Sequence, residues 1–262
     1  MEDLDMTWGE KLEKLLNTRR DGWTYEVVNT GVRGYNSFQL LVLHSMYLKN
    51  LEYDLLVLYL NANDMTANGE YGPFTYRELF EAKTGGRWNE VEKVMGVGRS
   101  SDGATLTARL QNRLDDSTLY RGLTRAIVNW RGKRVFGQGE FKFKRANPIE
   151  DYIKNLEGFH DLAEERNAQA LFTSEFIYTV IHANKELELE HTMEFINAMR
   201  ETAARLGVPF CDTYQMLNEY PDPAELVFPW DIVHFNETGT DVLSRKMVEC
   251  LETNGLLPPR AH

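Results

Sequence analysis

The chain has 262 residues, 42% of them hydrophobic, and a formal net charge of −11 at pH 7. This length and apolar content suffice for one large domain with a buried core, and the acidic balance argues against nucleic acid as a partner. No run of about 18 apolar residues is present, so we expect no transmembrane helix. Two cysteines argue against a disulfide scaffold and a cysteine-rich metal site, and the six histidines lack zinc-type spacing.

The first half of the chain alternates between helix and strand patterns. Residues 7–17 are amphipathic and predict a helix that Thr7 would cap. A short strand is expected at residues 25–30, and a second helix at residues 37–49. Residues 53–60 form a nearly continuous apolar run, which is typical of a strand buried on both faces of a parallel sheet.

Residues 66–147 interrupt this alternation. They contain several glycines and then a helical pattern from about 104 to 131. Residues 99–145 carry eleven Lys or Arg against four Asp or Glu, a local charge of +7, which leaves −18 for the rest of the chain. We therefore expect a single domain over residues 1–262 with a mostly helical, basic cap inserted at about 66–147.

The second half of the chain resumes the alternation. The expected order is helix 149–166, strand 168–174, helix 186–206 closed by Gly207 as its C-cap, strand 208–212, and a last helix in which Gly239 permits close packing. Alternating strands and helices with apolar strands predict an α/β protein whose mostly parallel sheet is covered on both faces. Reactive groups in such proteins collect at the carboxyl ends of the strands.

Three candidate groups fall at such strand ends. Asp231 precedes His234 by three residues, so its carboxylate can accept a hydrogen bond from one ring nitrogen and leave the other as a general base. The loop at Gly34 offers a backbone N–H, and the side-chain amide of Asn63 can donate to a developing oxyanion. Each group alone has an ordinary interpretation as a turn, a strand-end Asx turn or a helix-capping loop. Their occurrence together, in this order, favours catalysis.

At these positions the sequence resembles the SGNH, or GDSL-type, hydrolase family. The resemblance is carried by residues 29–37, 61–64 and 231–239, and it covers most of the chain except the insertion. It implies a flavodoxin-like three-layer α/β/α fold and ester hydrolysis without a metal or other cofactor. Gly34 and Asn63 would form the oxyanion hole, His234 would be the base, and Asp231 would orient it.

The sequence departs from the family pattern at two places. Asn61 stands where the family usually has glycine. The family's first strand, which ends in Gly-Asp-Ser with the nucleophile, should precede Thr7 and has no counterpart, so the nucleophile is missing from the matched positions. Of the serines near the proposed site, Ser37 is expected to cap the second helix and Ser174 to make a local turn bond. We therefore expect the chain as written to be a poor esterase.

The missing strand would lie between the strands at 25–30 and 53–60 in the family's sheet. Because buried backbone groups need partners, we expect these two strands to pair directly or another segment to fill the gap, for example one from a second copy of the chain. The sequence therefore leaves open whether the protein forms a homo-oligomer. The acidic start at Met1 has no signal core, which predicts a cytoplasmic location as written, while a leader lost from it would indicate secretion.

Two functions are compatible with these patterns. The first is an ester hydrolase for a small-molecule ester or an acylated carbohydrate, with the basic insertion as a lid over the substrate pocket. The second is a non-catalytic α/β binding module for a carbohydrate or an anionic ligand. Labelling by a serine-reactive fluorophosphonate distinguishes the two functions.

Overall fold

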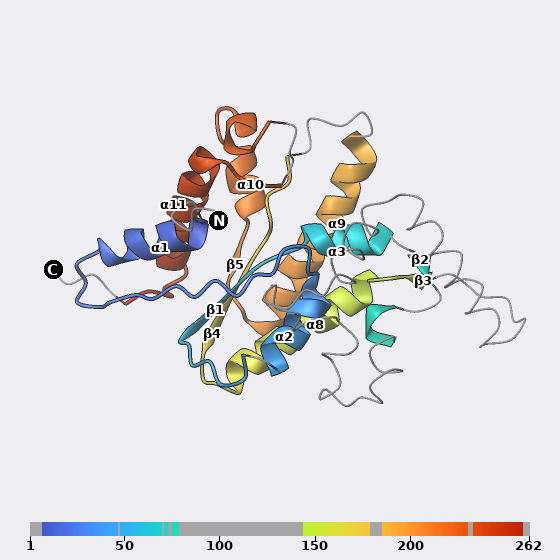
Figure 1. Ribbon diagram of the computed structural model, residues 1–262, viewed down its shortest axis with the longest axis horizontal. Helices are drawn as coiled ribbons and strands as arrows, with labels where there is room; N and C mark the ends of the chain where they lie inside the picture. The colour runs from blue at the N-terminus through green and yellow to red at the C-terminus, as the bar shows by residue number, and fades with distance from the viewer. Residues whose placement is uncertain are drawn as a thin grey trace, which may run out of the picture. The chain divides into compact units, whose positions relative to one another are not determined.

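A computed structural model describes residues 7–46, 48–69, 71–72, 75–78, 144–178, 185–229 and 233–258 (Figure 1). Its main body contains the helices α1 (Trp8–Asn17), α2 (Ser37–Met46), α3 (Ala62–Gly69), α8 (Ile149–Glu164), α9 (Lys185–Leu206), α10 (Thr213–Asn218) and α11 (Glu237–Thr253), the 3-10 helix η5 (Pro223–Leu226), and the strands β1 (Leu55–Tyr59), β4 (Gln169–Thr173) and β5 (Phe210–Cys211). None of the described helices combines the length and apolar character that crossing a bilayer requires.

The three strands of the main body form a parallel sheet in the order β1-β4-β5. Strand β1 pairs with β4 from Leu55 opposite Gln169 to Tyr59 opposite Thr173. Strand β5 pairs with the other edge of β4. The strands expected at 53–60, 168–174 and 208–212 are thus confirmed, together with their parallel direction.

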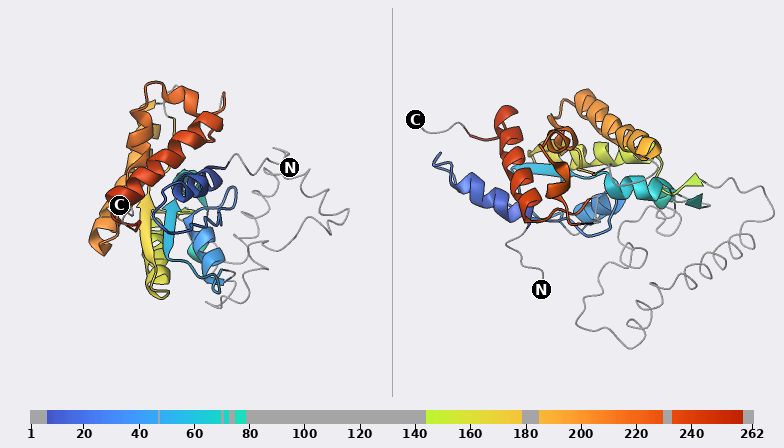
Figure 2. Two further views of the ribbon diagram at one scale, coloured as in Figure 1. Left: turned by 90° about the vertical axis from the view of Figure 1, so that its left-hand side faces the viewer. Right: turned by 90° about the horizontal axis from the view of Figure 1, so that it is seen from above.

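Alternate side chains of the strands point to opposite faces of this sheet. Leu56 and Leu58 pack in one cluster with apolar residues of α2, α8 and α9. Leu55 and Val57 pack in a second cluster with residues of α1, α10 and α11. Figures 1 and 2 show the two groups of helices on opposite sides of the strands. The expected three-layer α/β/α arrangement is therefore confirmed.

The strand expected at residues 25–30 was a wrong prediction. The backbone there is bound by side chains of α1 instead of a neighbouring strand. Asn17 accepts from the Tyr25 N–H and donates to the Tyr25 carbonyl, both at 2.9 Å, and the Val27 N–H donates to Glu13 at 2.7 Å. These bonds satisfy backbone groups that a sheet would otherwise pair.

Direct pairing of residues 25–30 with β1 is therefore not found. Among the described residues β1 has β4 on one side and no strand on the other, and no other described segment fills the gap. Tyr25 and Val27 nevertheless pack in the same apolar cluster as Leu55 and Val57. Side-chain packing thus holds the segment near the sheet without a backbone ladder.

The chain divides into two compact units, and the second spans Glu70–Ala146. In this second unit strand β2 (Tyr71–Gly72) pairs antiparallel with β3 (Lys144–Arg145) near the two ends of the segment. The expected helix at about 104–131 lies outside the described residues.

Helix ends in the main body follow local sequence signals. Thr7 accepts from the Glu10 N–H at the start of α1. Gly207 has a positive φ of 69° after α9, where the Val208 N–H donates to the Ala203 carbonyl, as in a Schellman motif. A Cβ at Gly239 would lie 1.9 Å from the Leu226 carbonyl oxygen. The expected roles of these three residues are confirmed.

The two cysteines are joined, although the sequence argued against a disulfide scaffold. Cys211 and Cys250 form a disulfide that connects β5 to α11 across a sequence separation of 39 residues, with Cα atoms 6.0 Å apart. Both cysteines are buried. Packing of the last helix against the sheet brings them together, which no local sequence pattern could show.

Candidate functional site

The carboxyl ends of β1 and β4 are locked together by two side chains. Glu175, two residues after β4, accepts hydrogen bonds through one oxygen from the Asn61 N–H at 3.1 Å and the Ala62 N–H at 2.9 Å. The Asn61 side chain in turn accepts from the Glu175 N–H at 2.6 Å. Helix α3 therefore begins against the segment that follows β4.

Asn63 and the loop at Gly34 lie next to each other. The Asn63 side-chain amide donates to the Tyr35 carbonyl at 3.0 Å, which uses one of its two protons. Gly34 has a positive φ of 79°, a conformation that favours glycine. Both Asn63 and Gly34 are exposed. Two segments far apart in sequence, the loop at Gly34 and the first turn of α3, thus meet at an exposed position.

A buried polar network lies behind this surface. The Asp64 carboxylate accepts from the backbone N–H and hydroxyl of Ser37 and from the Asn147 amide, and Asn155 donates to the Ser37 hydroxyl at 2.9 Å. Burial raises the pKa of Asp64 to about 7, while the hydrogen bonds from Ser37 and Asn147 act against that rise. The network anchors α3 to the start of α2 and to α8.

His234 is exposed and lies in a loop whose backbone is held on both sides. Its carbonyl accepts from the Phe228 N–H at 3.1 Å, and Phe235 bridges to Val227 in antiparallel fashion. Asn236 then caps α11 by accepting from the Gly239 N–H at 3.0 Å. The base expected from the sequence thus sits immediately before a capped helix.

The His234 loop and the start of α3 belong to one neighbourhood. Val233 and Ala62 pack against the same apolar cluster. Burial raises the pKa of Glu175, whereas the two backbone N–H groups and the charge of His234 lower it. His234 therefore lies within electrostatic range of the carboxylate that holds α3. Asp231, its expected partner, lies outside the described residues.

The structure corrects the expected roles of two serines. Asn36, not Ser37, caps α2, because Asn36 accepts from the Gln39 N–H at 3.0 Å while Ser37 bonds to Asp64. Ser174 makes no local turn bond. Its hydroxyl donates to Asp212 at 3.0 Å and accepts from the Tyr214 N–H at 3.0 Å. Both hydroxyls are buried and already engaged, which makes them poor nucleophiles.

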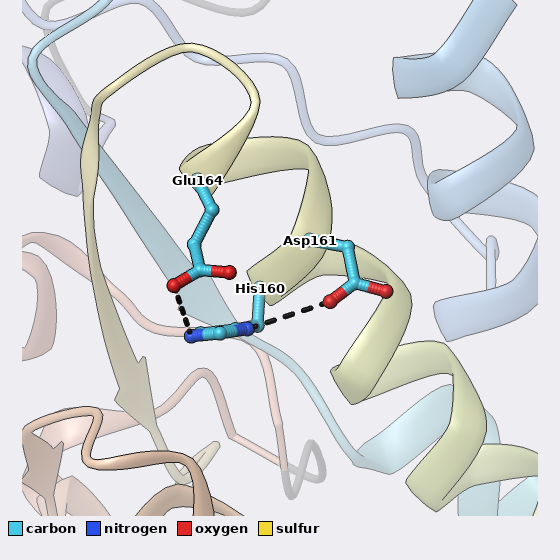
Figure 3. Close-up of side chains that lie close together, drawn as sticks. All are labelled: His160, Asp161 and Glu164. Atoms are coloured by element: carbon cyan, nitrogen blue, oxygen red, sulfur yellow. Dashed lines mark ion pairs between the residues drawn. The ribbon is translucent and has the colours of Figure 1, made fainter.

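A second cluster of ionisable groups lies at the opposite, amino edge of the sheet. Figure 3 shows His160 of α8 with Asp161 facing Nδ1 at 3.5 Å and Glu164 facing Nε2 at 3.6 Å. The two carboxylates face opposite ring nitrogens, and one ligand atom from each of the three residues lies within 4.8 Å of the other two. A groove of about 380 Å³ beside it is lined by residues that include Gln169 and Gly207.

Sequence comparison assigns the chain to a family. Residues 2–242, most of the chain, match the profile of the GDSL-like Lipase/Acylhydrolase family. The chain belongs to this family. Members of this lineage are ester hydrolases, and the match agrees with the resemblance at residues 29–37, 61–64 and 231–239. No curated protein matches the chain in sequence.

Solved structures similar to this chain share its fold at low sequence identity. A lipase/acylhydrolase from Enterococcus faecalis superposes with a TM-score of 0.56 at 14% identity and covers 97% of this chain and 88% of its own. The acetyl xylan esterase AlAXEase gives 0.54 at 14% identity over 95% and 92%. LAE5, an alpha/beta hydrolase enzyme from the metagenome of Lake Arreo, Spain, gives 0.54 at 16% identity over 97% and 84%.

The sequence interpretation missed two carboxylates at this site. Asp64 directly follows Asn63, within the stretch 61–64, and Glu175 directly follows Ser174, one residue beyond the strand expected at 168–174. An acidic residue just beyond an apolar strand was the available signal. Their partners are contributed by distant segments, and the sequence alone does not pair them.

Proposed function

We propose that the protein hydrolyses carboxylic esters at the carboxyl edge of its sheet. A nucleophilic hydroxyl attacks the ester carbonyl, and the imidazole of His234 takes its proton and returns it to the leaving alcohol, with Asp231 orienting the ring. The Gly34 N–H and the Asn63 amide donate to the oxyanion of the tetrahedral intermediate. Water then cleaves the acyl-enzyme by the same route in reverse.

The hydrogen bond between the Asn63 amide and the Tyr35 carbonyl carries this proposal. It joins Asn63 to the residue after Gly34, and both Asn63 and Gly34 are exposed, which supports their joint role as donors. Val233, next to His234, packs against the same apolar cluster as Ala62, and Glu175 binds the helix that bears Asn63. Base and donors are therefore supported by one set of interlocked elements.

The substrate class that we propose is a small ester or an acylated carbohydrate. His234 and Asn63 are exposed, which suits a water-soluble ester that arrives from solvent. The similarity to the acetyl xylan esterase AlAXEase adds support for a short acyl group on a carbohydrate.

We place the nucleophile outside the described residues. Ser37, Ser174 and Ser244 are buried, and the Ser45 hydroxyl donates to the Leu41 carbonyl of its own helix. Loss of a nucleophile in a triad enzyme costs on the order of a million-fold in turnover. If residues 1–262 contain no other hydroxyl that can attack the ester carbonyl, the ester turnover of the chain is poor. The burial of these serines also favours the second candidate function, a non-catalytic module that binds a carbohydrate or an anion.

Ester hydrolysis by site variants tests the proposal. Rates on p-nitrophenyl acetate and on acetylated xylooligosaccharides are compared for the wild type, His234→Gln and Asn63→Ala. Both variants lower kcat by about 100-fold or more, because each removes a group that acts in the transition state. His160→Gln, at the amino edge, is the control and stays within about twofold of wild type.

Two results decide between the candidate functions. A wild-type rate equal to that of buffer, with tight binding of a carbohydrate, supports the binding module. Hydrolysis that is lost in His234→Gln while fluorophosphonate labels Ser37 or Ser174 supports an esterase but contradicts our placement of the nucleophile.

A further inference from the structure

We propose that Glu175 is a positioning residue of this site, whose carboxylate fixes the first turn of α3 and hence the direction in which Asn63 presents its amide. The proposal rests on the function proposed above, in which Asn63 is an oxyanion donor. It assigns a role to a carboxylate that takes no part in the proton transfers described so far.

The geometry of the Glu175 carboxylate supports this role. One oxygen accepts from both Asn61 N–H and Ala62 N–H, at 3.1 and 2.9 Å. The first N–H groups of a helix have no partner within it, so a residue just before the helix usually caps them. Here the acceptor comes from a residue 113 positions away in sequence. Asn63 is the next residue of the helix, so its direction depends on this long-range contact.

The Glu175 side of the contact is itself held in place. The Asn61 side chain accepts from the Glu175 N–H at 2.6 Å. The Phe176 N–H donates to the Tyr59 hydroxyl at 3.1 Å, which ties the same segment to the end of β1. The carboxylate is thus fixed by its own backbone, and it transmits this fixed position to α3.

Asn63 lies between two anchors of this kind. On one side Glu175 binds the start of the helix, and on the other Asp64 accepts from the Ser37 backbone N–H at 3.0 and 3.1 Å. The Asn63 amide itself donates to the Tyr35 carbonyl. Because Asp64 orients the helix towards α2 without contacting its first N–H groups, the removal of Glu175 releases the end of the helix that bears Asn63.

A buried carboxylate is a costly way to cap a helix, because its charge is taken out of water. The residue just before α3 is Asn61, a common capping residue, but its side-chain oxygen accepts from the Glu175 N–H instead. The carboxylate instead places negative charge within range of His234, the group that becomes positive during the proposed reaction. Asp64, Tyr59 and Tyr152 are the other titratable groups that interact with it.

Variants of Glu175 separate its hydrogen bonds from its charge. Glu175→Gln keeps an oxygen that can accept both N–H bonds, whereas Glu175→Ala keeps none. Thr7→Ala is the matched control, since it removes the side-chain cap of α1, which is not part of the site. Three readouts are compared in the full chain: amide hydrogen exchange at Ala62, the NMR resonances of the Asn63 side-chain amide, and kcat and KM for ester hydrolysis.

We expect Glu175→Ala to speed exchange at Ala62 by about tenfold or more, because the amide loses its acceptor, and to shift the Asn63 side-chain resonances. Its kcat falls by about 10- to 100-fold with KM within about twofold, as expected for a misplaced transition-state donor. Glu175→Gln restores the exchange and the resonances, and Thr7→Ala leaves all three readouts at wild-type values. If Glu175→Ala does not fold, Glu175→Asp, which is one methylene shorter, replaces it.

Unchanged exchange and resonances in Glu175→Ala overturn the proposal, and so do equal changes in Thr7→Ala. If the wild type hydrolyses no ester, the proposed function fails, but exchange and resonances still decide whether Glu175 positions Asn63. If these two respond while kcat does not, Glu175 is a structural cap only and the positioning role is refuted.

Discussion

Asp64 is a carboxyl group that the fold buries among hydrogen-bond donors, and its pKa of about 7 has a consequence for stability. In the unfolded chain an Asp titrates at about 4. Between these pH values the folded protein holds a proton on Asp64 that the unfolded chain has lost. The contribution of Asp64 to the free energy of unfolding therefore decreases as the pH rises from about 4 to about 7. Above this window the contribution is constant.

Urea unfolding at several pH values tests this effect in the Asp64→Asn variant. Between pH 5 and pH 8 we expect the wild type to lose about 1–3 kcal/mol more stability than the variant, because the variant has no carboxyl group to ionise. Glu175, whose pKa is also raised, interacts with Asp64, so the same profiles are recorded for Glu175→Gln and for the double variant. Parallel pH profiles for the two proteins would show that Asp64 titrates near its ordinary value.

Gly239 is a second residue with a testable environment, because its surroundings leave no space for a Cβ atom. A Cβ at this position would overlap the Leu226 carbonyl oxygen at 1.9 Å, so Gly239→Ala must displace either α11 or η5. We expect a loss of about 1–3 kcal/mol and a decrease in Tm of several degrees. Gly9→Ala is the control, because Gly9 is also in the first turn of a helix and its Cβ would meet Val27 at an ordinary 3.7 Å. A Tm for Gly239→Ala equal to that of the control would contradict the close contact.

A disulfide connects strand β5 to helix α11. The Cys211–Cys250 disulfide closes a loop over a sequence separation of 39 residues, and such a cross-link typically stabilises a fold by about 2–4 kcal/mol. We expect a reducing agent to lower the urea midpoint of the wild type. The double variant Cys211→Ala/Cys250→Ala should be insensitive to the reducing agent. Two free thiols found by mass spectrometry in the native, unreduced protein would contradict the disulfide.

Most elements could be predicted from the sequence because their signals are local. The apolar runs at β1 and β4 and the amphipathic pattern of α8 each lie within one segment. Helix α3 was missed, since its start is set by Glu175 and its anchor by Ser37, both far away in sequence. Residues 25–30 have strand composition, but α1 side chains take their backbone hydrogen bonds.

In the candidate site, too, local sequence signals could be predicted and contacts between distant segments could not. Spacing and residue type single out Gly34, Asn63 and His234, because a loop glycine, a strand-end amide and a pre-helix histidine are visible in sequence. Glu175 was not predicted, since its role depends on the backbone N–H groups of another segment, and backbone groups carry no sequence signature. The pairing of Asp231 with His234 stays a prediction.

At the scale of the whole molecule, the two edges of one sheet differ in what they offer. The carboxyl edge presents the exposed Gly34 loop and Asn63, and Val233, next to the exposed His234, packs against the same apolar cluster as Ala62. The amino edge presents a groove lined by Gln169 and Gly207. We expect a tetrahedral, anionic reaction centre to bind at the carboxyl edge, and the amino edge is an internal control within the same protein.

Binding of such an anion is measured by NMR in a titration of the isotopically labelled protein with a methylphosphonate monoester. The phosphonate imitates the charge and shape of the intermediate and requires no nucleophile. We expect the backbone amide of Gly34 and the side-chain amide of Asn63 to shift together with one dissociation constant, while the Gly207 amide does not move. Shifts confined to Gly207 and its neighbours, or a Gly34 amide unmoved at saturation, would contradict an oxyanion hole at the carboxyl edge.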